Sequence, residues 1–259
     1  MDPALAEKAK ILRALHHGGS PLLLANVWDV ASALAVAETG FRALGTSSSA
    51  IAASLGYGDD DTMPVEEAFG VVRRVAGAVD LPVTADVEAG YGLPAGDLVQ
   101  RLLEAGAVGC NLEDSDHHGP APLVPAERQA QRIAAVRRAA AAEGVEVVVN
   151  ARIDVFRGGV EQSEATLAEA IRRAELYVRA GADCVYPIML QDEALIGAFV
   201  AAVDAPVNIL RRGALTVSAL AALGVRRVSM GGALFRSAGA AVEEQARRLL
   251  AESSGPAPR

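Results

Sequence analysis

Two acidic residues near the end of one β-branched segment are the side chains best placed to do chemistry. The segment Val83–Glu88 carries Asp86 and Glu88 two positions apart, and a Gly-Tyr-Gly turn follows it. Side chains at positions i and i+2 of a strand lie on one face, so we expect both carboxylates to project together where this strand stops. Two such anions repel each other unless a cation or a shared proton lies between them. The pair therefore indicates a metal site, and the alternative is a polar strand end before a glycine turn.

Polar side chains also end several other predicted strands. Glu113 ends one strand, Arg152 ends another, and Ser47–Ser49 and Asn208 end two more. If these ends meet at one edge, carboxylates from neighbouring strands converge with an arginine opposite them. Oxygen ligands without a His or Cys cluster favour Mg²⁺, with Mn²⁺ as the alternative, over Zn²⁺. An arginine there can hold a substrate carboxylate in a bidentate pair. A purely structural ion-pair network is the competing interpretation.

The elements that must position these residues alternate between apolar strand-like runs and segments of helical period. The predicted strands are 22–27, 42–47, 82–87, 107–113, 146–152, 183–188, 206–210 and 226–230. Eight β/α repeats without a linker predict an α/β protein with a single (β/α)₈ barrel over residues 1–252. A doubly wound sheet is the alternative, but the first strand lacks a Gly-x-Gly-x-x-Gly sequence after it. The segment 253–259 is rich in Pro, Gly and Ser, and we expect it to be disordered.

Composition restricts the function and the location. The net charge of −8 argues against a nucleic-acid partner, and no apolar run approaches a membrane span. The first residues do not have the layout of a signal peptide, so we expect a cytoplasmic protein.

Cys110 and Cys184 lie in apolar runs and are predicted to be buried thiols. The only lysines are Lys8 and Lys10, before the first strand, so a Schiff-base aldolase is not expected. A long helix at 233–251 has an apolar stripe that could pack on another subunit.

Three segments carry a resemblance to a known family. Asp86–Gly92, Asn111–Ser115 and Asn150–Asp154 resemble the signature segments of the isocitrate lyase/phosphoenolpyruvate mutase superfamily. The segment Gly45–Asp61 resembles the substrate loop of that superfamily, and the likeness covers residues 22 to about 250. The resemblance implies a barrel whose last helix is exchanged between subunits of a homodimer or homotetramer. It also implies Mg²⁺ at the strand ends and a 2-oxo acid, or its enolate, bound through two oxygens.

The resemblance also implies roles for single residues. Asp86 would bind the metal directly, Glu88 and Glu113 would hold metal-bound waters, and Asp59 would lie near the metal. Arg152 would bind the oxygens of the substrate and stabilise negative charge that develops on them. The substrate-binding residues expected on this basis are Ser47, Ser48 and Ser49 through their backbone groups, together with Asp86, Arg152 and, as a determinant of specificity, Asn208.

The loop after the fourth predicted strand departs from that superfamily. Its isocitrate and methylisocitrate lyases have a cysteine there as the acid/base, and its phosphonomutases have a lysine and an asparagine. Here Asp116–Pro125 contains none of these, so the usual isocitrate lyase and phosphonomutase activities are not expected. His117 and His118 in this loop are candidate proton carriers, because imidazole titrates near neutral pH. An exposed polar turn is the alternative.

The sequence as a whole predicts a Mg²⁺-dependent lyase-type enzyme. It would act on a 2-oxo acid or a hydroxy di- or tricarboxylate, making or breaking a C–C bond through a metal-stabilised enolate, with Glu113 and Arg152 as catalytic residues. Alternatives are an oxaloacetate hydrolase- or decarboxylase-like enzyme and a Mg²⁺-dependent 2-oxo acid binding protein without lyase activity. An unrelated phosphate-binding barrel, suggested by Asn208–Arg212 and by Gly231 and Gly232, leaves the acidic cluster unexplained. The substrate, the general acid/base and the choice of dimer or tetramer remain open.

Overall fold

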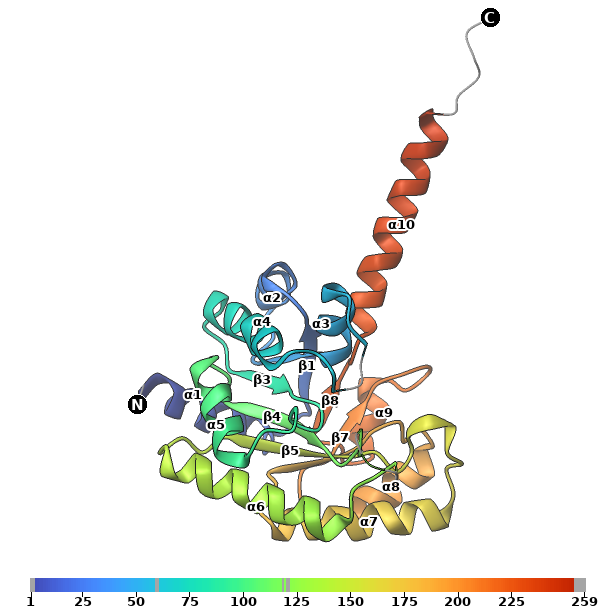
Figure 1. The fold of residues 1–259 in the computed structure, drawn as a ribbon. Coiled ribbons are helices and arrows are strands. Elements are labelled where there is room, and N and C mark those ends of the chain that lie inside the picture. The colour runs from blue at the N-terminus through green and yellow to red at the C-terminus, as the bar shows by residue number, and fades with distance from the viewer. Residues whose placement is uncertain (1–2, 59–60, 118, 120–121, 254–259) are drawn as a thin grey trace, which may run out of the picture.

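Eight parallel strands form a barrel in the computed structural model, which describes residues 3–58, 61–117, 119 and 122–253 (Figure 1). The hydrogen-bonded order is β6-β5-β4-β3-β2-β1-β8-β7, and a bridge between Val185 and Val207 joins the remaining pair, β6 and β7. The strands are β1 (Leu22–Val27), β2 (Leu44–Thr46), β3 (Val83–Asp86), β4 (Gly109–Glu113), β5 (Val148–Ile153), β6 (Cys184–Pro187), β7 (Asn208–Leu210) and β8 (Arg227–Ser229). The predicted (β/α)₈ architecture is therefore confirmed.

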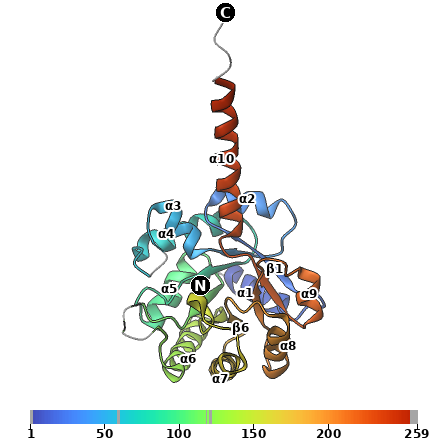
Figure 2. The ribbon, with the colours of Figure 1, turned by 90° about the vertical axis from the view of Figure 1, so that its right-hand side faces the viewer.

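Helices alternate with the strands and surround the barrel (Figures 1 and 2). They are α1 (Pro3–Leu15), α2 (Val30–Ala37), α3 (Ser48–Leu55), α4 (Val65–Ala78), α5 (Ala95–Glu104), α6 (Ala126–Ala142), α7 (Glu164–Arg179), α8 (Glu193–Ala202), α9 (Val217–Ala222) and α10 (Ala233–Ser253), with a 3₁₀ turn η1 (Arg157–Gly159). Side-chain caps set several helix starts. Ser163 accepts a hydrogen bond from the Thr166 amide before α7, and Asp29 caps α2 in the same way.

Each predicted strand overlaps an observed one, but most observed strands are shorter. The difference matters at β7, which was predicted to end in Asn208. Because β7 begins at Asn208 and ends at Leu210, the amide side chain of Asn208 lies below the rim of the barrel rather than on it. Asn208 is fully buried and pairs in register with Arg227. It is not among the residues that line the cavity at the strand ends, and its expected role in substrate specificity stays a prediction.

The layer between sheet and helices is aliphatic, as the composition predicted, but the barrel interior is polar. Branched apolar residues usually fill such interiors. Here Asn111 and Asn150, within β4 and β5, and Asn208 and Arg227, at the starts of β7 and β8, are buried. The Asn150 amide donates to Asn111 Oδ1 at 2.8 Å, and Arg227 Nη2 donates to the same oxygen at 2.9 Å. A buried polar layer therefore lies directly beneath the strand ends.

The last helix leaves the barrel instead of packing along it. Figures 1 and 2 show α10 projecting away from the other helices, with only its first turns near β1. Phe235 packs edge-on against Trp28 at 5.3 Å, and beyond it Val242 and Leu249 are 70% and 66% exposed. The tail was predicted to begin at residue 253, but Ser253 still belongs to α10, and the rest of the predicted tail, 254–259, lies outside the described residues. Among the helices that are described, none is both long enough and apolar enough to span a bilayer.

Candidate active site at the carboxyl ends of the strands

Asp86 is the last residue of β3, and its carboxylate is held by Ser48, at the start of α3, and by Asn111 on β4. Ser48 donates to Asp86 Oδ2 from its hydroxyl at 2.9 Å and from its backbone amide at 3.3 Å. Asn111 Nδ2 lies 3.5 Å from Asp86 Oδ1. Ser48 is the first residue of α3, so the positive end of that helix points towards the carboxylate. The arrangement holds the Asp86 carboxylate at the rim of the barrel.

Glu88 reaches the same region by a different route from the one predicted. β3 stops at Asp86 and Glu88 adopts a left-handed conformation (φ 49°), so strand alternation does not bring the two side chains to one face. Glu88 Oε2 instead accepts a 2.6 Å hydrogen bond from the amide of Asp61, whose own carboxylate accepts from the amide of Tyr91. Asp61 and Tyr91 also have positive φ values. Three strained residues in one cluster are a feature that often accompanies functional sites.

Glu113 and Arg152 form a buried ion pair at the ends of β4 and β5. Arg152 Nη1 lies 2.6 Å from Glu113 Oε2, and its Nε and Nη2 each donate to Asp154 at 2.8 Å. Ser115 also donates to Asp154, at 2.6 Å. A guanidinium has five N–H donors, and these contacts use three of them. Arg152 is thus fixed in one orientation with donor capacity left for a ligand.

Burial and neighbouring charges shift the pKa values of Glu113 and His117. Burial raises the pKa of Glu113 above its ordinary value, although Arg152 and His117 act in the opposite direction. His117 Nε2 lies 2.6 Å from Glu113 Oε1, and this hydrogen bond raises the pKa of the imidazole. Asp86 contributes to the electrostatic repulsion that raises the pKa of Glu113. A divalent cation between these carboxylates would relieve that repulsion.

A cavity of about 330 Å³ opens among these strand ends. Five of the predicted residues line it: Ser47, Ser48, Ser49, Asp86 and Arg152. Glu88, Glu113, His117 and Asn208 do not line it. His117 instead lines two other hollows at the rim, and Glu113 contacts both His117 and Arg152. Asp59 and His118 lie outside the described residues.

The structure adds cavity-lining residues to which the sequence analysis gave no role there. Arg157 comes from η1, Ser229 ends β8 and Arg236 lies on α10. Asn26 lines the cavity and also positions α10, since its Oδ1 accepts from the amides of Met230 and Gly231 at 2.9 Å. The only available signal was polar residues at the ends of β1 and β8, and no local pattern shows that the first turn of α10 brings Arg236 to the cavity.

A buried cation supports the cavity from below. Arg227 is fully enclosed in the barrel, and its Nη1 lies 3.4 Å from His16 Nε2. His16 Nδ1 lies 2.8 Å from the carbonyl of Leu12, and burial together with Arg227 lowers its pKa to about 3. The imidazole is therefore neutral, donating to Leu12 and accepting from Arg227. Through Asn111 this chain of contacts reaches Asp86.

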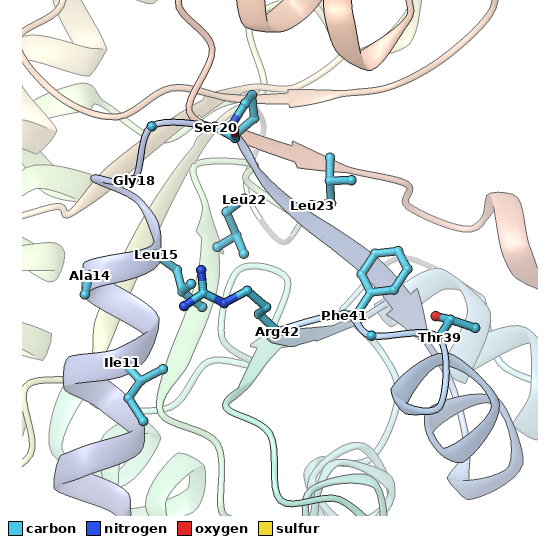
Figure 3. Close-up of a pocket in the computed structure, with 13 residues that line it drawn as sticks. Ile11, Ala14, Leu15, Gly18, Ser20, Leu22, Leu23, Thr39, Phe41 and Arg42 are labelled. Atoms are coloured by element: carbon cyan, nitrogen blue, oxygen red, sulfur yellow. The ribbon is translucent and has the colours of Figure 1, made fainter.

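A larger hollow, of about 690 Å³, lies far from this chemistry (Figure 3). It is on the outside of the barrel between α1 and the strands β1 and β2. Ile11, Leu15, Leu22, Leu23 and Phe41 line it, and Leu23 is 39% exposed. Active sites of such barrels lie at the carboxyl ends of the strands, and this hollow contains no acidic residue, so it is not the catalytic centre.

Sequence similarity relates this chain to known enzymes. A family model described as phosphoenolpyruvate phosphomutase matches residues 12–250. The chain belongs to this family. It is 32% identical to an uncharacterised protein of Mycobacterium tuberculosis over 92% of this chain and 88% of that protein. It is also 31% identical to the 2-methylisocitrate lyase of Bacillus subtilis, over 72% of this chain and 62% of that enzyme.

Solved structures agree with the assignment. A protein of Burkholderia cenocepacia J2315, provisionally named a phosphonomutase, superimposes with a TM-score of 0.88. The two are 40% identical, and the match covers 93% of this chain and 99% of that one. The predicted membership of the isocitrate lyase/phosphoenolpyruvate mutase superfamily is therefore confirmed. Its members are lyases and mutases, so this chain is an enzyme.

Proposed function

We propose that this member of the phosphoenolpyruvate phosphomutase family is a Mg²⁺-dependent carbon–carbon lyase. Its substrate would be a 2-oxo acid or a hydroxy di- or tricarboxylate. A C–C bond of this substrate would be cleaved or formed through an enolate. One observation carries the proposal: Asp86 and Arg152, from β3 and β5, line the same cavity of about 330 Å³. A carboxylate for a cation and a guanidinium for an oxyanion are the two groups that enolate chemistry requires.

The residues present suit Mg²⁺ better than a metal that needs a closed protein shell. Within the described part of the chain, no three His, Cys, Asp or Glu side chains are arranged to hold a metal ion. Mg²⁺ is commonly bound through one or two carboxylates and keeps several waters. Asp86 would be its direct ligand, while Glu113 and Glu88 would hold its waters. Bound there, Mg²⁺ would supply positive charge beside the oxo group and so favour the enolate.

The protein groups would then bind and orient the rest of the substrate. The amide of Ser49 stands in the first turn of α3, where a carboxylate is favoured, whereas the amides of Ser47 and Ser48 already donate to Val27 and Asp86. Arg152, held rigidly by Glu113 and Asp154, would donate to the oxygen on which negative charge develops. Because its partners are buried carboxylates, Arg152 needs little rearrangement when the charge forms.

The opposite side of the cavity favours a second anionic group on the substrate. Arg212 and Arg236 line it, and neither forms an ion pair with an acidic side chain in the residues that the structure describes. The side chain of Arg236 lies against the turn before α10. Its Nη1 is so close to Gly232 that a Cβ atom at that position would lie only 2.8 Å away. Two cations facing one cavity support a di- or tricarboxylate rather than a monocarboxylate.

Product release from a panel of hydroxy di- and tricarboxylates, with oxaloacetate included, tests the proposal. We expect at least one compound to release a 2-oxo acid in the presence of Mg²⁺, and chelation of the metal to abolish that release. Asp86→Asn should lower kcat/KM at least about 100-fold. Glu66→Gln is the matched control, since Glu66 pairs with Arg101 on the outside of the barrel.

Each alternative gives its own result in this experiment. Oxalate and acetate from oxaloacetate would identify a hydrolase. Mg²⁺-dependent binding without turnover of any compound would identify a binding protein instead of the lyase. Equal turnover by wild type and Asp86→Asn would contradict the metal site.

We also propose a homo-oligomer in which α10 is exchanged between subunits. At 1.5 Å per residue its 21 residues extend about 32 Å from the barrel. The outer hollow beside β1 in Figure 3 has apolar walls that the helix after β8 would cover in a regular barrel. Val242 and Leu249, spaced seven residues apart on one face of α10, would fill the hollow of the partner.

A further inference from the structure

The proposed reaction needs a group that gives a proton to carbon, and the structure restricts which residue that can be. Of the described residues that line the cavity, none is a cysteine, a lysine or a histidine. Cys110 and Cys184 are fully buried, and burial raises the pKa of each thiol to about 12. His117 interacts with Glu113 and faces the hollows behind Arg152. The usual proton carriers of enzymes are thus absent from this part of the wall.

Most other polar groups in the wall are unsuited to donate a proton. The guanidinium groups of Arg152 and Arg236 stay protonated at any accessible pH. Asp86 is needed as an anion, and serine hydroxyls such as that of Ser49 are far weaker acids than a phenol. Tyr186, on β6, is the remaining acid in the described wall, and its side chain is only 4% exposed.

We propose that the phenol of Tyr186 is the proton donor to the enolate carbon in this cavity, an assignment that rests on the proposed function. Tyr186 pairs in register with Arg152 on the neighbouring strand, so both side chains enter the same layer at the rim. Ser229, at the end of β8, lines the same cavity. The donor therefore lies beside the group that binds the developing oxyanion.

The balance of the step follows from the groups present. The electron pair of the enolate double bond forms a new C–H bond, and the O–H bond of Tyr186 breaks. The oxyanion becomes the carbonyl of the product 2-oxo acid, and a phenolate remains. The positive charge of Arg152, which pairs in register with Tyr186, stabilises that phenolate. Solvent water then returns a proton to it when the product leaves.

Burial keeps the phenol in its donating form. The pKa of Tyr186 is raised to about 12, chiefly by burial, while Arg152 and Ser229 act against that rise. At neutral pH the group is protonated and ready to donate. The nearby cation limits how unfavourable the transient phenolate becomes, which is the balance that a general acid requires.

Ketonisation of enolpyruvate isolates this step from the unknown substrate. An added phosphatase releases enolpyruvate from phosphoenolpyruvate, and its decay is followed by ultraviolet absorbance with protein and Mg²⁺ present. We expect wild type to accelerate the decay and Tyr186→Phe to lose that acceleration by about 100-fold or more. The Mg²⁺-dependent affinity for oxalate, a planar analogue of the enolate, should stay within about threefold of wild type in the same variant.

Two results would overturn the assignment. One is a Tyr186→Phe variant that accelerates the decay of enolpyruvate to within about threefold of the wild-type rate. That result would be strongest if His117→Gln abolished the acceleration. The other is a wild-type protein that binds oxalate with Mg²⁺ but does not accelerate the decay, which leaves the metal and oxo-acid site intact. If wild type fails to bind oxalate as well, the proposed function fails together with the donor.

Discussion

Replacing Arg152 by methionine should destabilise the fold more than any surface substitution, because it removes one cation from between two buried carboxylates. Arg152 Nη1 lies 2.6 Å from Glu113, and two further N–H groups donate to Asp154 at 2.8 Å. Both acidic side chains are at most 2% exposed. Breaking a buried ion pair by removing one partner costs about 3–5 kcal/mol, and the variant should lose that much free energy of unfolding at pH 8.

The loss should depend on pH in a definite direction. Burial already raises the pKa of Glu113, and removal of Arg152 raises it further because the cation acts in the opposite direction. A carboxyl whose folded-state pKa is raised favours folding at low pH, and that contribution is lost as pH rises through the folded-state pKa. The difference between wild type and Arg152→Met should therefore be smaller at pH 5 than at pH 8.

Urea unfolding followed by circular dichroism at both pH values measures this difference. Arg152→Met combined with Asp154→Asn is the matched control, since it removes one of the two stranded charges and should recover part of the stability. A destabilisation below about 1 kcal/mol at pH 8, or one that does not change with pH, would refute the electrostatic account of the pair.

Three further predictions concern the rim and the last helix. The hydrogen bond to Glu113 raises the pKa of His117 in the folded state. The contribution of this hydrogen bond to folding stability is therefore present below the pKa of the unfolded state and is lost as pH rises through the pKa of the folded state. His117→Gln should accordingly lower the free energy of unfolding, measured in urea, more at pH 6 than at pH 9. An equal loss at both pH values would count against a charged imidazole. Arg236→Gln should raise the KM or Kd of a dicarboxylate about tenfold or more while leaving that of pyruvate unchanged, and equal effects on both would remove the second anion site. Val242→Glu should lower the mass measured by light scattering, because an exchanged helix would bury this position, and an unchanged oligomer would exclude α10 from the interface.

Much of the fold could be predicted from local pattern, because each β/α repeat carries its own signals. Ser163 marks the start of α7 by the chemistry of its cap, and the apolar run of β1 matches the observed strand at both ends. Asp86 and Arg152 were identifiable as site residues because they end their strands, and strand ends meet in a barrel of this kind. Those inferences need only local sequence and one rule of topology.

The remaining parts of the site depend on geometry that local pattern does not encode. Glu88 lies near the rim through a left-handed turn, whereas the reasoning from strand alternation assumed an extended backbone. Asn208 lies below the rim because β7 begins where it was expected to end. Tyr186 and Arg236 line one cavity only once β6 has joined the barrel and the first turn of α10 follows β8. Long-range closure fixes these placements.

Titration calorimetry with oxalate tests the central claim most directly. The account predicts that wild type binds oxalate only when Mg²⁺ is present, and that Asp86→Asn abolishes this binding while a urea melt shows the variant folded. Binding that is equally tight without Mg²⁺, or unaffected by Asp86→Asn, would contradict a metal-dependent oxo-acid site at the end of β3.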